Sequence, residues 1–326
     1  MNGRFVISLD FEGYWGMSDI VEFNESKINS YFYNYENTIN TLHSYLEKNI
    51  KSTWAIVGFL LAESAQEILD NGYVITPNYK NSRLDNYKII KKISQRKQQF
   101  ASDRLFKQAF CQKLSGTNNI EIASHTFSHF YCNEPNVSIE DFQKEVDFFR
   151  DLLKTKYGKD VKALILPRNQ INTQFLRLAN LHEITVVRSN PRHYELFSSN
   201  ILNRLNRLYN SLLPNYNIFD FTNKTLSHLK ISPGTRFLRY NVRNEKLLSI
   251  FTNAVIKEMT YAARNGLHYH LWWHPHNFCH NLDFKMVLLD QIISHYKDLN
   301  KRFGFKAVWM SELANETSEY SSGCEA

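Results

Sequence analysis

The feature that most constrains the fold of this chain is a regular alternation between short apolar runs and helical patterns. Runs of four to eight residues that are rich in β-branched and aromatic side chains are typical of buried strands. The predicted strands are 4–10, 52–59, 120–123, 163–166, 184–188, 267–273 and 307–310, and the predicted helices between them are 29–48, 138–157, 172–181 and 283–301. This alternation favours a parallel α/β architecture, and seven strands favour a closed or nearly closed barrel. A doubly wound open sheet is the alternative.

Two long segments interrupt the alternation, at about 64–115 and 190–264. The second segment carries two further predicted helices, around 201–212 and 245–264. The chain has no internal repeat and no low-complexity linker. We therefore expect a single catalytic domain over residues 1–326, with these two segments as insertions.

The positive charge of the chain is concentrated in the first insertion. Residues 80–113 contain ten Lys and Arg against two Asp, a net +8, whereas the whole chain has a formal net charge of +7. One interpretation is a solvated helical face. The other is an arm over the functional site that attracts an anionic glycan, a diphosphate or a membrane surface. Motifs that read nucleic-acid bases are absent, so we expect no nucleic-acid partner.

The four cysteines are scattered, without the spacing of a zinc knuckle or a disulfide framework. No apolar run reaches the length of about 18 residues that a membrane span requires. Acidic residues follow the first strand at once, which is unlike a signal peptide. These features predict a cytoplasmic protein with reduced thiols.

His125 and His129 follow the predicted strand 120–123 and are separated by three residues. If residues 125–129 form a helical turn, the two side chains lie on one face, with Cβ atoms roughly 5–6 Å apart. Two imidazoles in that position can share a metal ion. An isolated His-x-x-x-His pair is also compatible with packing alone.

Asp10 and Glu12 stand at the end of the first predicted strand, on the same face because strand side chains alternate. Two carboxylates there repel each other unless a cation or a shared proton compensates them. A metal held by Glu12, His125 and His129 would have two imidazoles, one carboxylate and an open position, which is a catalytic coordination set. Asp10 would then be the general base toward water at that position.

Two further segments carry side chains with possible catalytic roles. Arg168 follows the strand 163–166 and could orient Asp10 and hold it ionised. His274 lies at the end of the strand 267–273 and could act as general acid toward a leaving amine, with His276 as the rival. Trp272 or Trp273 could stack on a sugar ring, although either is also compatible with the core.

The order of these motifs resembles the polysaccharide deacetylase family over about residues 4–310. An acidic motif on the first strand is followed by His125-Thr126-Phe127-Ser128-His129, an arginine motif after the fourth strand, and a histidine motif on the last-but-one strand. The resemblance implies an irregular (β/α)7 barrel, a divalent metal that is usually zinc, and hydrolysis of an N-acyl group on an amino sugar. It assigns Glu12, His125 and His129 to the metal, Asp10 to the base, and Arg168 and His274 to catalytic positions.

Some positions depart from the family pattern. The acids are spaced as Asp10-x-Glu12 rather than adjacent, Pro167-Arg168-Asn169 replaces the usual Arg-x-Pro order, and Arg188 stands near the place of an aspartate-rich fourth motif. The resemblance therefore predicts a metal-dependent hydrolase of linear amide bonds without defining its acyl group or its sugar.

We expect an N-acetylated or N-formylated amino sugar as substrate, either nucleotide-linked, lipid-linked or polymeric, in the biosynthesis of a surface polysaccharide such as lipopolysaccharide or capsule. Two alternatives remain. A glycoside hydrolase on a related barrel would use Asp10 or Glu12 with a second carboxylate. A catalytically inactive protein with the same fold could bind a glycan through the basic insertion.

Overall fold

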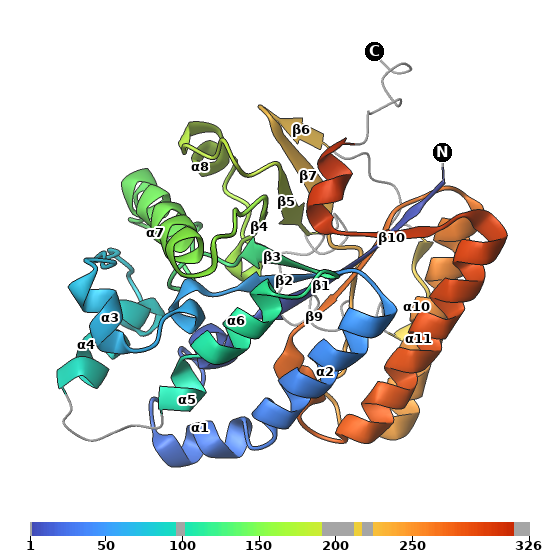
Figure 1. Cartoon of the computed structure of the whole chain (residues 1–326), viewed down its shortest axis with the longest axis horizontal. Helices are drawn as coiled ribbons and strands as arrows, with labels where there is room; N and C mark the ends of the chain where they lie inside the picture. The colour runs from blue at the N-terminus through green and yellow to red at the C-terminus, as the bar shows by residue number, and fades with distance from the viewer. Residues whose placement is uncertain (1, 96–101, 191–211, 217–223, 316–326) are drawn as a thin grey trace.

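The computed structural model describes residues 2–95, 102–190, 212–216 and 224–315. Its ten strands form one sheet (Figure 1). The strands are β1 (Arg4–Phe11), β2 (Ser52–Ile56), β3 (Ile120–Ser124), β4 (Ala163–Ile165), β5 (Val186–Ser189), β6 (Lys224–Leu226), β7 (Leu229–Pro233), β8 (Arg236–Phe237), β9 (Tyr269–Trp273) and β10 (Lys306–Val308). The helices are α1 (Glu25–Tyr31), α2 (Tyr35–Asn49), α3 (Ala65–Asp70), α4 (Asn86–Gln95), α5 (Ser102–Leu105), α6 (Gln108–Ser115), α7 (Ile139–Tyr157), α8 (Thr173–Leu178), α10 (Glu245–Arg264) and α11 (Leu282–Phe303).

The sheet is mostly parallel, with the strand order β6-β7-β5-β4-β3-β2-β1-β9-β8 and with β10 paired to β1. The β6–β7 hairpin is antiparallel. In the described residues no strand pair closes the sheet into a ring, but only Gly234 and Thr235 separate β7 from β8. The α/β prediction is therefore confirmed, and the sheet is barrel-like without being closed.

The two faces of the sheet are covered differently. Along β1, Phe5, Ile7, Leu9 and Phe11 belong to the large apolar core. In Figure 1, α7 and α8 lie on the left of the sheet and α10 and α11 on the right. The opposite face carries Val6 with a small cluster that includes Met310, and the side chains of Ser8 and Asp10 follow it along the strand. Strand alternation thus places Asp10 on the small inner face rather than in the main core.

The register of the parallel strands brings their carboxyl ends to a common edge. Phe11 of β1 is opposite Ile56 of β2, and Ile56 is opposite Ser124 of β3. On the other side of β1, Leu9 is opposite Trp273 of β9. The residues that follow these strands, Glu12, His125 and His274, therefore start from the same edge of the sheet.

The predicted elements differ from the structure mainly at their ends. The predicted helix 29–48 is two helices, α1 and α2, with a break at 32–34. The strand predicted over 52–59 ends at Ile56, and a 3-10 turn over Gly58–Leu61 follows. Helix α7 begins as predicted, with the Ser138 side chain accepting a hydrogen bond from the Asp141 amide.

The segment predicted as the insertion 190–264 contains three strands of the sheet, β6, β7 and β8, of which β7 pairs in parallel with β5. Helix α10 confirms the prediction over 245–264, and the helix predicted over 201–212 falls, except for its last residue, outside the described residues. The segment 64–115 contains α3, α4, α5 and α6. The assignment of the whole chain to a single domain remains a prediction.

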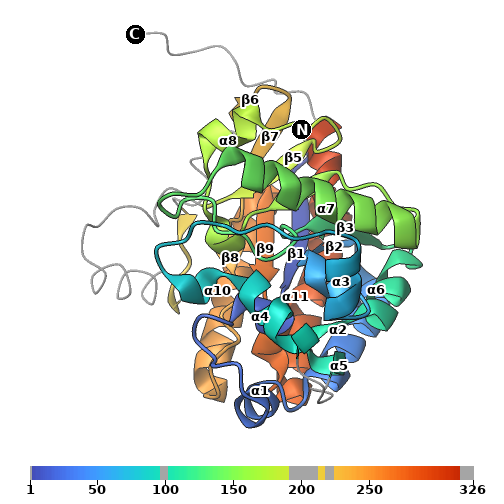
Figure 2. The ribbon, with the colours of Figure 1, turned by 90° about the vertical axis from the view of Figure 1, so that its left-hand side faces the viewer.

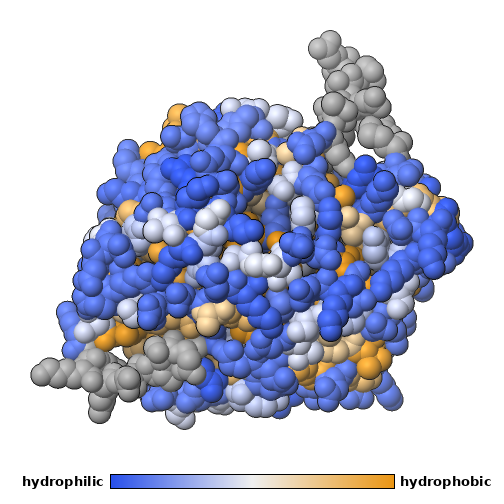
Figure 3. Space-filling model, in the orientation of Figure 1, coloured by the Kyte–Doolittle hydropathy of each residue, from blue (hydrophilic) through white to orange (hydrophobic). Residues whose placement is uncertain are grey.

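The surface in the view of Figure 3 is mostly hydrophilic, with smaller hydrophobic areas between the polar ones. None of the helices in the described ranges has both the length and the hydropathy that crossing a membrane requires.

Candidate metal centre and catalytic cluster

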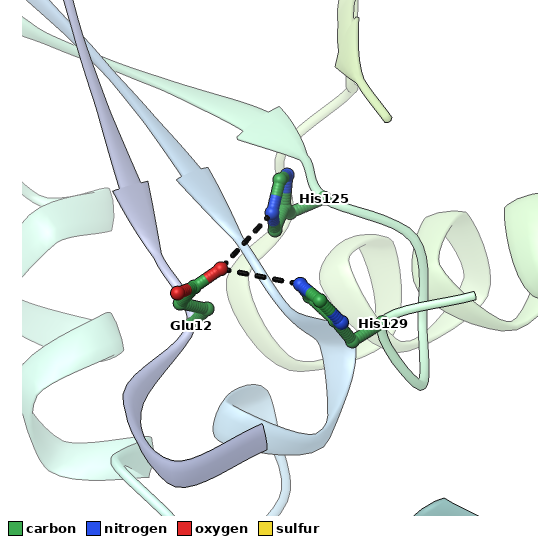
Figure 4. A group of neighbouring side chains, drawn as sticks. All are labelled: Glu12, His125 and His129. Atoms are coloured by element: carbon green, nitrogen blue, oxygen red, sulfur yellow. Dashed lines mark hydrogen bonds and ion pairs between the residues drawn. The ribbon is translucent and has the colours of Figure 1, made fainter. Parts of the chain in front are cut away.

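Three of the predicted site residues meet at the common strand edge (Figure 4). Oε2 of Glu12 lies 3.2 Å from Nε2 of His129 and 3.4 Å from Nε2 of His125. All three side chains are buried, and the two imidazole rings lie 5.2 Å apart between centroids. The group is one of two in the described residues whose ligand atoms lie close enough together to share a metal ion.

The two histidines are not on a helical turn, as the sequence analysis assumed. Residues 125–131, which we call the histidine loop, are non-helical, and Thr126 and His129 have φ angles of 59° and 66°. His129 nevertheless contacts Glu12 through its Nε2. Convergence of the two imidazoles thus depends on the loop backbone, not on helical spacing.

Hydrogen bonding fixes the tautomer of His125. Its Nδ1 lies 2.8 Å from the carbonyl oxygen of Ile165, so Nδ1 carries the hydrogen and donates it. In the neutral ring, Nε2 then has a lone pair that faces Glu12, and this buried atom has no hydrogen-bond partner among the described residues. Two acceptors facing each other need a cation or a proton between them. A histidine whose other nitrogen donates to a backbone carbonyl is the usual geometry of a metal ligand.

The pKa values agree with an ionised carboxylate and a neutral imidazole. Burial opposes the charge of Glu12, but the neighbouring His274 and the hydrogen bond from His129 outweigh it and hold the pKa of Glu12 well below its usual range. Burial lowers the pKa of His129, although Glu12 counteracts this. An anionic oxygen beside neutral nitrogens is the donor set that a divalent metal such as zinc accepts.

Asp10 is held by Arg188, not by Arg168. The Arg188 guanidinium donates to both oxygens of Asp10, at 2.7 and 2.6 Å, and also to Ser8 and Asn169. It stacks over the ring of Trp272 at 4.2 Å. Burial opposes the charge of Asp10, but the charge and hydrogen bonds of Arg188 outweigh it and lower the pKa of Asp10. Asp10 therefore stays ionised in a fixed orientation.

The prediction that Arg168 orients Asp10 is wrong. Arg168 has a φ of 54°, forms a salt bridge with Asp19, and lies over the ring of Tyr131 at 4.8 Å. The sharp turn after β4 directs its side chain away from Asp10 and directs Asn169 toward Arg188. The clue to Arg188 in the sequence is a single cation at the end of an otherwise apolar strand. Asn169 gives no such signal.

His274 lies beside both carboxylates. Its Nε2 is 3.8 Å from Oδ2 of Asp10 and 3.6 Å from Oε1 of Glu12, and its side chain is partly open to solvent. The ring of His276 stacks against it, with centroids 5.0 Å apart. Burial and the neighbouring His274 lower the pKa of His276 to about 3, so His276 is neutral. Glu12, His274 and His276 form the second group in the described residues that could hold a metal ion.

A buried carboxyl group fixes the histidine loop from behind. Glu145 of α7 accepts hydrogen bonds from the amide and the hydroxyl of Ser128, at 2.7 and 2.6 Å, and from the hydroxyl of Tyr87 in α4. Asn86 donates to the carbonyl oxygen of Ser128. Two residues of the first insertion therefore hold the loop that carries His129.

Comparisons with known proteins define the fold. No family model and no curated protein matches the chain. Among solved structures, a protein assigned as a polysaccharide deacetylase from Mycobacterium smegmatis has a TM-score of 0.51 at 10% identity, covering 96% of this chain and 89% of its own. The α-amylase AmyC from Thermotoga maritima has a TM-score of 0.56 at 11% identity. The match covers 98% of this chain and 76% of the amylase.

The 4-alpha-glucanotransferase from Thermococcus litoralis has a TM-score of 0.52 at 11% identity. The match covers 97% of this chain but only 41% of the glucanotransferase. At such identities the likeness concerns the fold, a barrel-like and mostly parallel α/β sheet. The polysaccharide deacetylase resemblance is thereby supported at the level of the fold.

We predict that Gly16→Ala weakens cation binding although it removes no ligand. A Cβ at position 16 would lie 2.0 Å from Cδ of Glu12, so the carboxylate must move. We expect at least about a tenfold loss of zinc affinity, comparable to the loss of an outer-shell partner. Competition with a chromophoric chelator measures it. Gly116→Ala is the matched control, because a Cβ there meets only ordinary contacts at 3.7 Å. Equal zinc affinity in Gly16→Ala and the wild type would contradict the placement of Glu12.

We predict that Glu145 makes stability depend on pH. Burial raises the pKa of Glu145 to about 7, against the hydrogen bonds from Ser128 and Tyr87. From about pH 4.5 to 7 the folded state keeps a proton that the unfolded chain releases, so the free energy of unfolding falls as pH rises, by up to about 3 kcal/mol. Glu145→Gln has no carboxyl group at this position, so its free energy of unfolding should not fall for this reason. Urea unfolding at pH 5 and pH 8 should show wild type losing stability relative to Glu145→Gln, and a difference independent of pH would contradict the prediction.

Proposed function

We propose that this protein is a metal-dependent hydrolase that removes an N-acyl group from an amino sugar. The observation that carries the proposal is the lone pair of His125 Nε2 facing the ionised Glu12 carboxylate, with His129 on the same oxygen. A divalent cation held by Glu12, His125 and His129, with zinc as the first candidate, would supply Lewis-acid polarisation of the acyl carbonyl and would acidify a water.

Asp10 is the proposed general base. It accepts a proton from the attacking water, and the bidentate Arg188 keeps it ionised and fixes its orientation. The same ion pair reduces the affinity of Asp10 for the proton. Asp10 therefore releases this proton readily once the amide bond breaks. Arg188 acts through Asp10 and is therefore a positioning residue, in the place that the sequence analysis gave to Arg168.

His274 is the proposed general acid. Its Nε2 lies within 4 Å of a carboxylate oxygen of Asp10 and of Glu12, so its ring is beside the proton that Asp10 has accepted. His276, held neutral by burial and by the charge of His274, is the weaker candidate for this role. The departing amine of the sugar takes the proton from His274.

The substrate we propose is an acylated amino sugar of a surface polysaccharide, handled in the cytoplasm before export. Lipopolysaccharide and capsule precursors belong to this class. The acyl group is acetyl or formyl, and the sugar is linked to a nucleotide, a lipid or a polymer. The fold-level likeness to the Mycobacterium smegmatis protein agrees with a deacetylase, and the choice of this reaction depends on the side chains of the candidate centre.

A glycoside hydrolase is the second candidate, because two of the solved structures with this fold are named as enzymes of glucan chemistry. Such an enzyme needs one protonated carboxyl group as acid. The pKa values of both Asp10 and Glu12 are lowered, so neither carboxyl group is suited to that role. Full activity of the metal-stripped protein on a glycoside would favour this candidate and would overturn the deacylase proposal.

We predict that Asp10→Asn retains the cation and loses turnover. The amide keeps the shape of the side chain but cannot take a proton, so kcat for acyl release should fall at least about 100-fold. Metal content by mass spectrometry and release of acetate or formate are the two measurements. Asp141→Asn, in the first turn of α7, is the matched control. Loss of the cation in Asp10→Asn would make Asp10 a ligand and contradict its role as base.

We predict that Arg188→Lys and Arg168→Lys differ in effect, although both preserve charge. Lysine cannot donate two parallel hydrogen bonds to Asp10, so kcat of Arg188→Lys should fall by about 10-fold or more, with the acidic limb of its pH profile displaced toward higher pH. Arg168 contacts the partly exposed Asp19, so Arg168→Lys should change kcat less than about threefold. Equal losses in the two variants would contradict the assignment of Arg188.

A further inference from the structure

A large cavity lies beside the candidate centre, between α1, α4 and the segment that follows β1. Figure 2 shows α1 and α4 on the same side of the molecule. The cavity has a volume of about 1240 Å³, which exceeds the roughly 300–1,000 Å³ of a usual ligand pocket. It has room for more than one sugar unit.

Two residues that line the cavity contact side chains at or beside the catalytic cluster. Tyr31 lines the cavity, and the ring of Tyr31 packs edge-on against His276, with centroids 6.2 Å apart. Asp19 also lines it and pairs with Arg168, which lies over Tyr131. The cavity therefore lies next to the candidate metal centre, one side chain away from His276.

Positive charge exceeds negative charge in the cavity wall. Five cationic and three anionic side chains line it. Each carboxylate has an ion-pair partner: Glu22 pairs with Lys27, Asp85 with Lys88, and Asp19 with Arg168.

Arg83, Lys92 and Arg243 remain as cations that form no ion pair with a carboxylate in the described part of the chain. They come from three separate segments: a 3-10 turn at Ser82–Leu84, helix α4, and the chain just before α10. The Arg243 guanidinium donates a hydrogen bond to the ring of His280, at 3.4 Å. Three cations from three segments in the wall of one cavity fit a multiply charged anion better than they fit a single carboxylate.

The remaining lining suits the neutral part of a glycan. Tyr31 offers an exposed aromatic ring, and Ser26 and Ser30 offer exposed hydroxyl groups. Rings and hydroxyls together bind sugars by stacking and hydrogen bonding. The cavity thus combines a sugar-binding wall with a cationic wall.

We propose that this cavity binds a phosphate or diphosphate group carried by the same molecule as the N-acyl amino sugar. The inference rests on the proposed function and narrows its substrate class to phosphorylated amino sugars. It gives the basic insertion a role at the site, since Arg83 and Lys92 belong to residues 80–113. The phosphate can come from a nucleotide, a lipid carrier or a simple sugar phosphate, which share this chemistry.

The first test measures binding without turnover. Inorganic pyrophosphate is titrated by calorimetry into the metal-loaded wild type, into Arg83→Gln/Lys92→Gln, and into the charge-matched control Lys257→Gln/Lys301→Gln, whose residues are exposed on α10 and α11. We expect the affinity of the first variant to fall at least about tenfold and that of the control to stay within twofold. Equal pyrophosphate affinity in all three proteins overturns the inference, whatever the protein hydrolyses.

The second test compares substrates. N-acetylglucosamine 1-phosphate, UDP-N-acetylglucosamine and neutral di-N-acetylchitobiose are assayed with the same proteins. The inference predicts that the wild type has a lower KM for a phosphorylated substrate than for the neutral sugar. In Arg83→Gln/Lys92→Gln the KM for the phosphorylated substrate should rise about tenfold, with kcat unchanged. The KM for the neutral sugar should be the same in both proteins. Preference for the diphosphate over the monophosphate would indicate a nucleotide or lipid carrier.

The outcomes separate the two proposals. Hydrolysis of the neutral sugar with equal efficiency, unaffected by the variant, overturns the inference and leaves the deacylase intact. Release of acyl groups from none of the three sugars counts against the deacylase, and the pyrophosphate titration then decides the inference alone.

Discussion

Burial of two carboxylates at the end of one strand is the constraint on which the site depends. Asp10 and Glu12 are both almost inaccessible to solvent, and each needs a compensating charge because burial of an isolated carboxylate is strongly unfavourable. Asp10 has the guanidinium of Arg188. Glu12 has the imidazoles of His125 and His129. The ring hydrogen of His125 points away from Glu12, because Nδ1 donates it to the carbonyl oxygen of Ile165. The two carboxylates therefore have different partners, and this difference separates a proposed base from a proposed metal ligand.

The fold produces this arrangement through strand register and alternation. Parallel pairing aligns the ends of β1, β2 and β3, so Glu12 and His125 leave the sheet at the same level. Alternation along β1 directs Asp10 to the small inner face, where Arg188 of β5 reaches it across the sheet. The histidine loop is then held from behind by Glu145 and Asn86, so part of the rigidity of the centre comes from the segment between β2 and β3.

Much of the fold and part of the site could be predicted from the sequence. The strands 4–10, 120–123 and 163–166 are apolar and short, so periodicity located them, and the residues at their ends followed. Glu12, His125 and His129 come together in the structure for that reason, although their roles remain proposals. The strand β7 was missed because Leu229 and Ile231 alternate with polar residues over only five positions that end in a proline, so no continuous apolar run marks it.

The error at Arg168 has a different origin. Periodicity gives the strand end but not the direction of a side chain in the turn beyond it, and the left-handed residues 168 and 169 reverse that direction. Arg188 lies within a strand, so the alternation of strand side chains could have predicted the face on which it lies. Its partner Asp10, however, is 178 residues away in the sequence. Only the three-dimensional arrangement shows that the two meet.

The most direct test of the central claim is a crystal structure of the zinc-loaded protein, with anomalous diffraction recorded on both sides of the zinc absorption edge. The account predicts one anomalous peak about 2.0–2.2 Å from the Glu12 carboxylate and from Nε2 of His125 and His129, with Asp10 still bound to Arg188. A peak between Glu12, His274 and His276, or no peak at Glu12 at all, would contradict it.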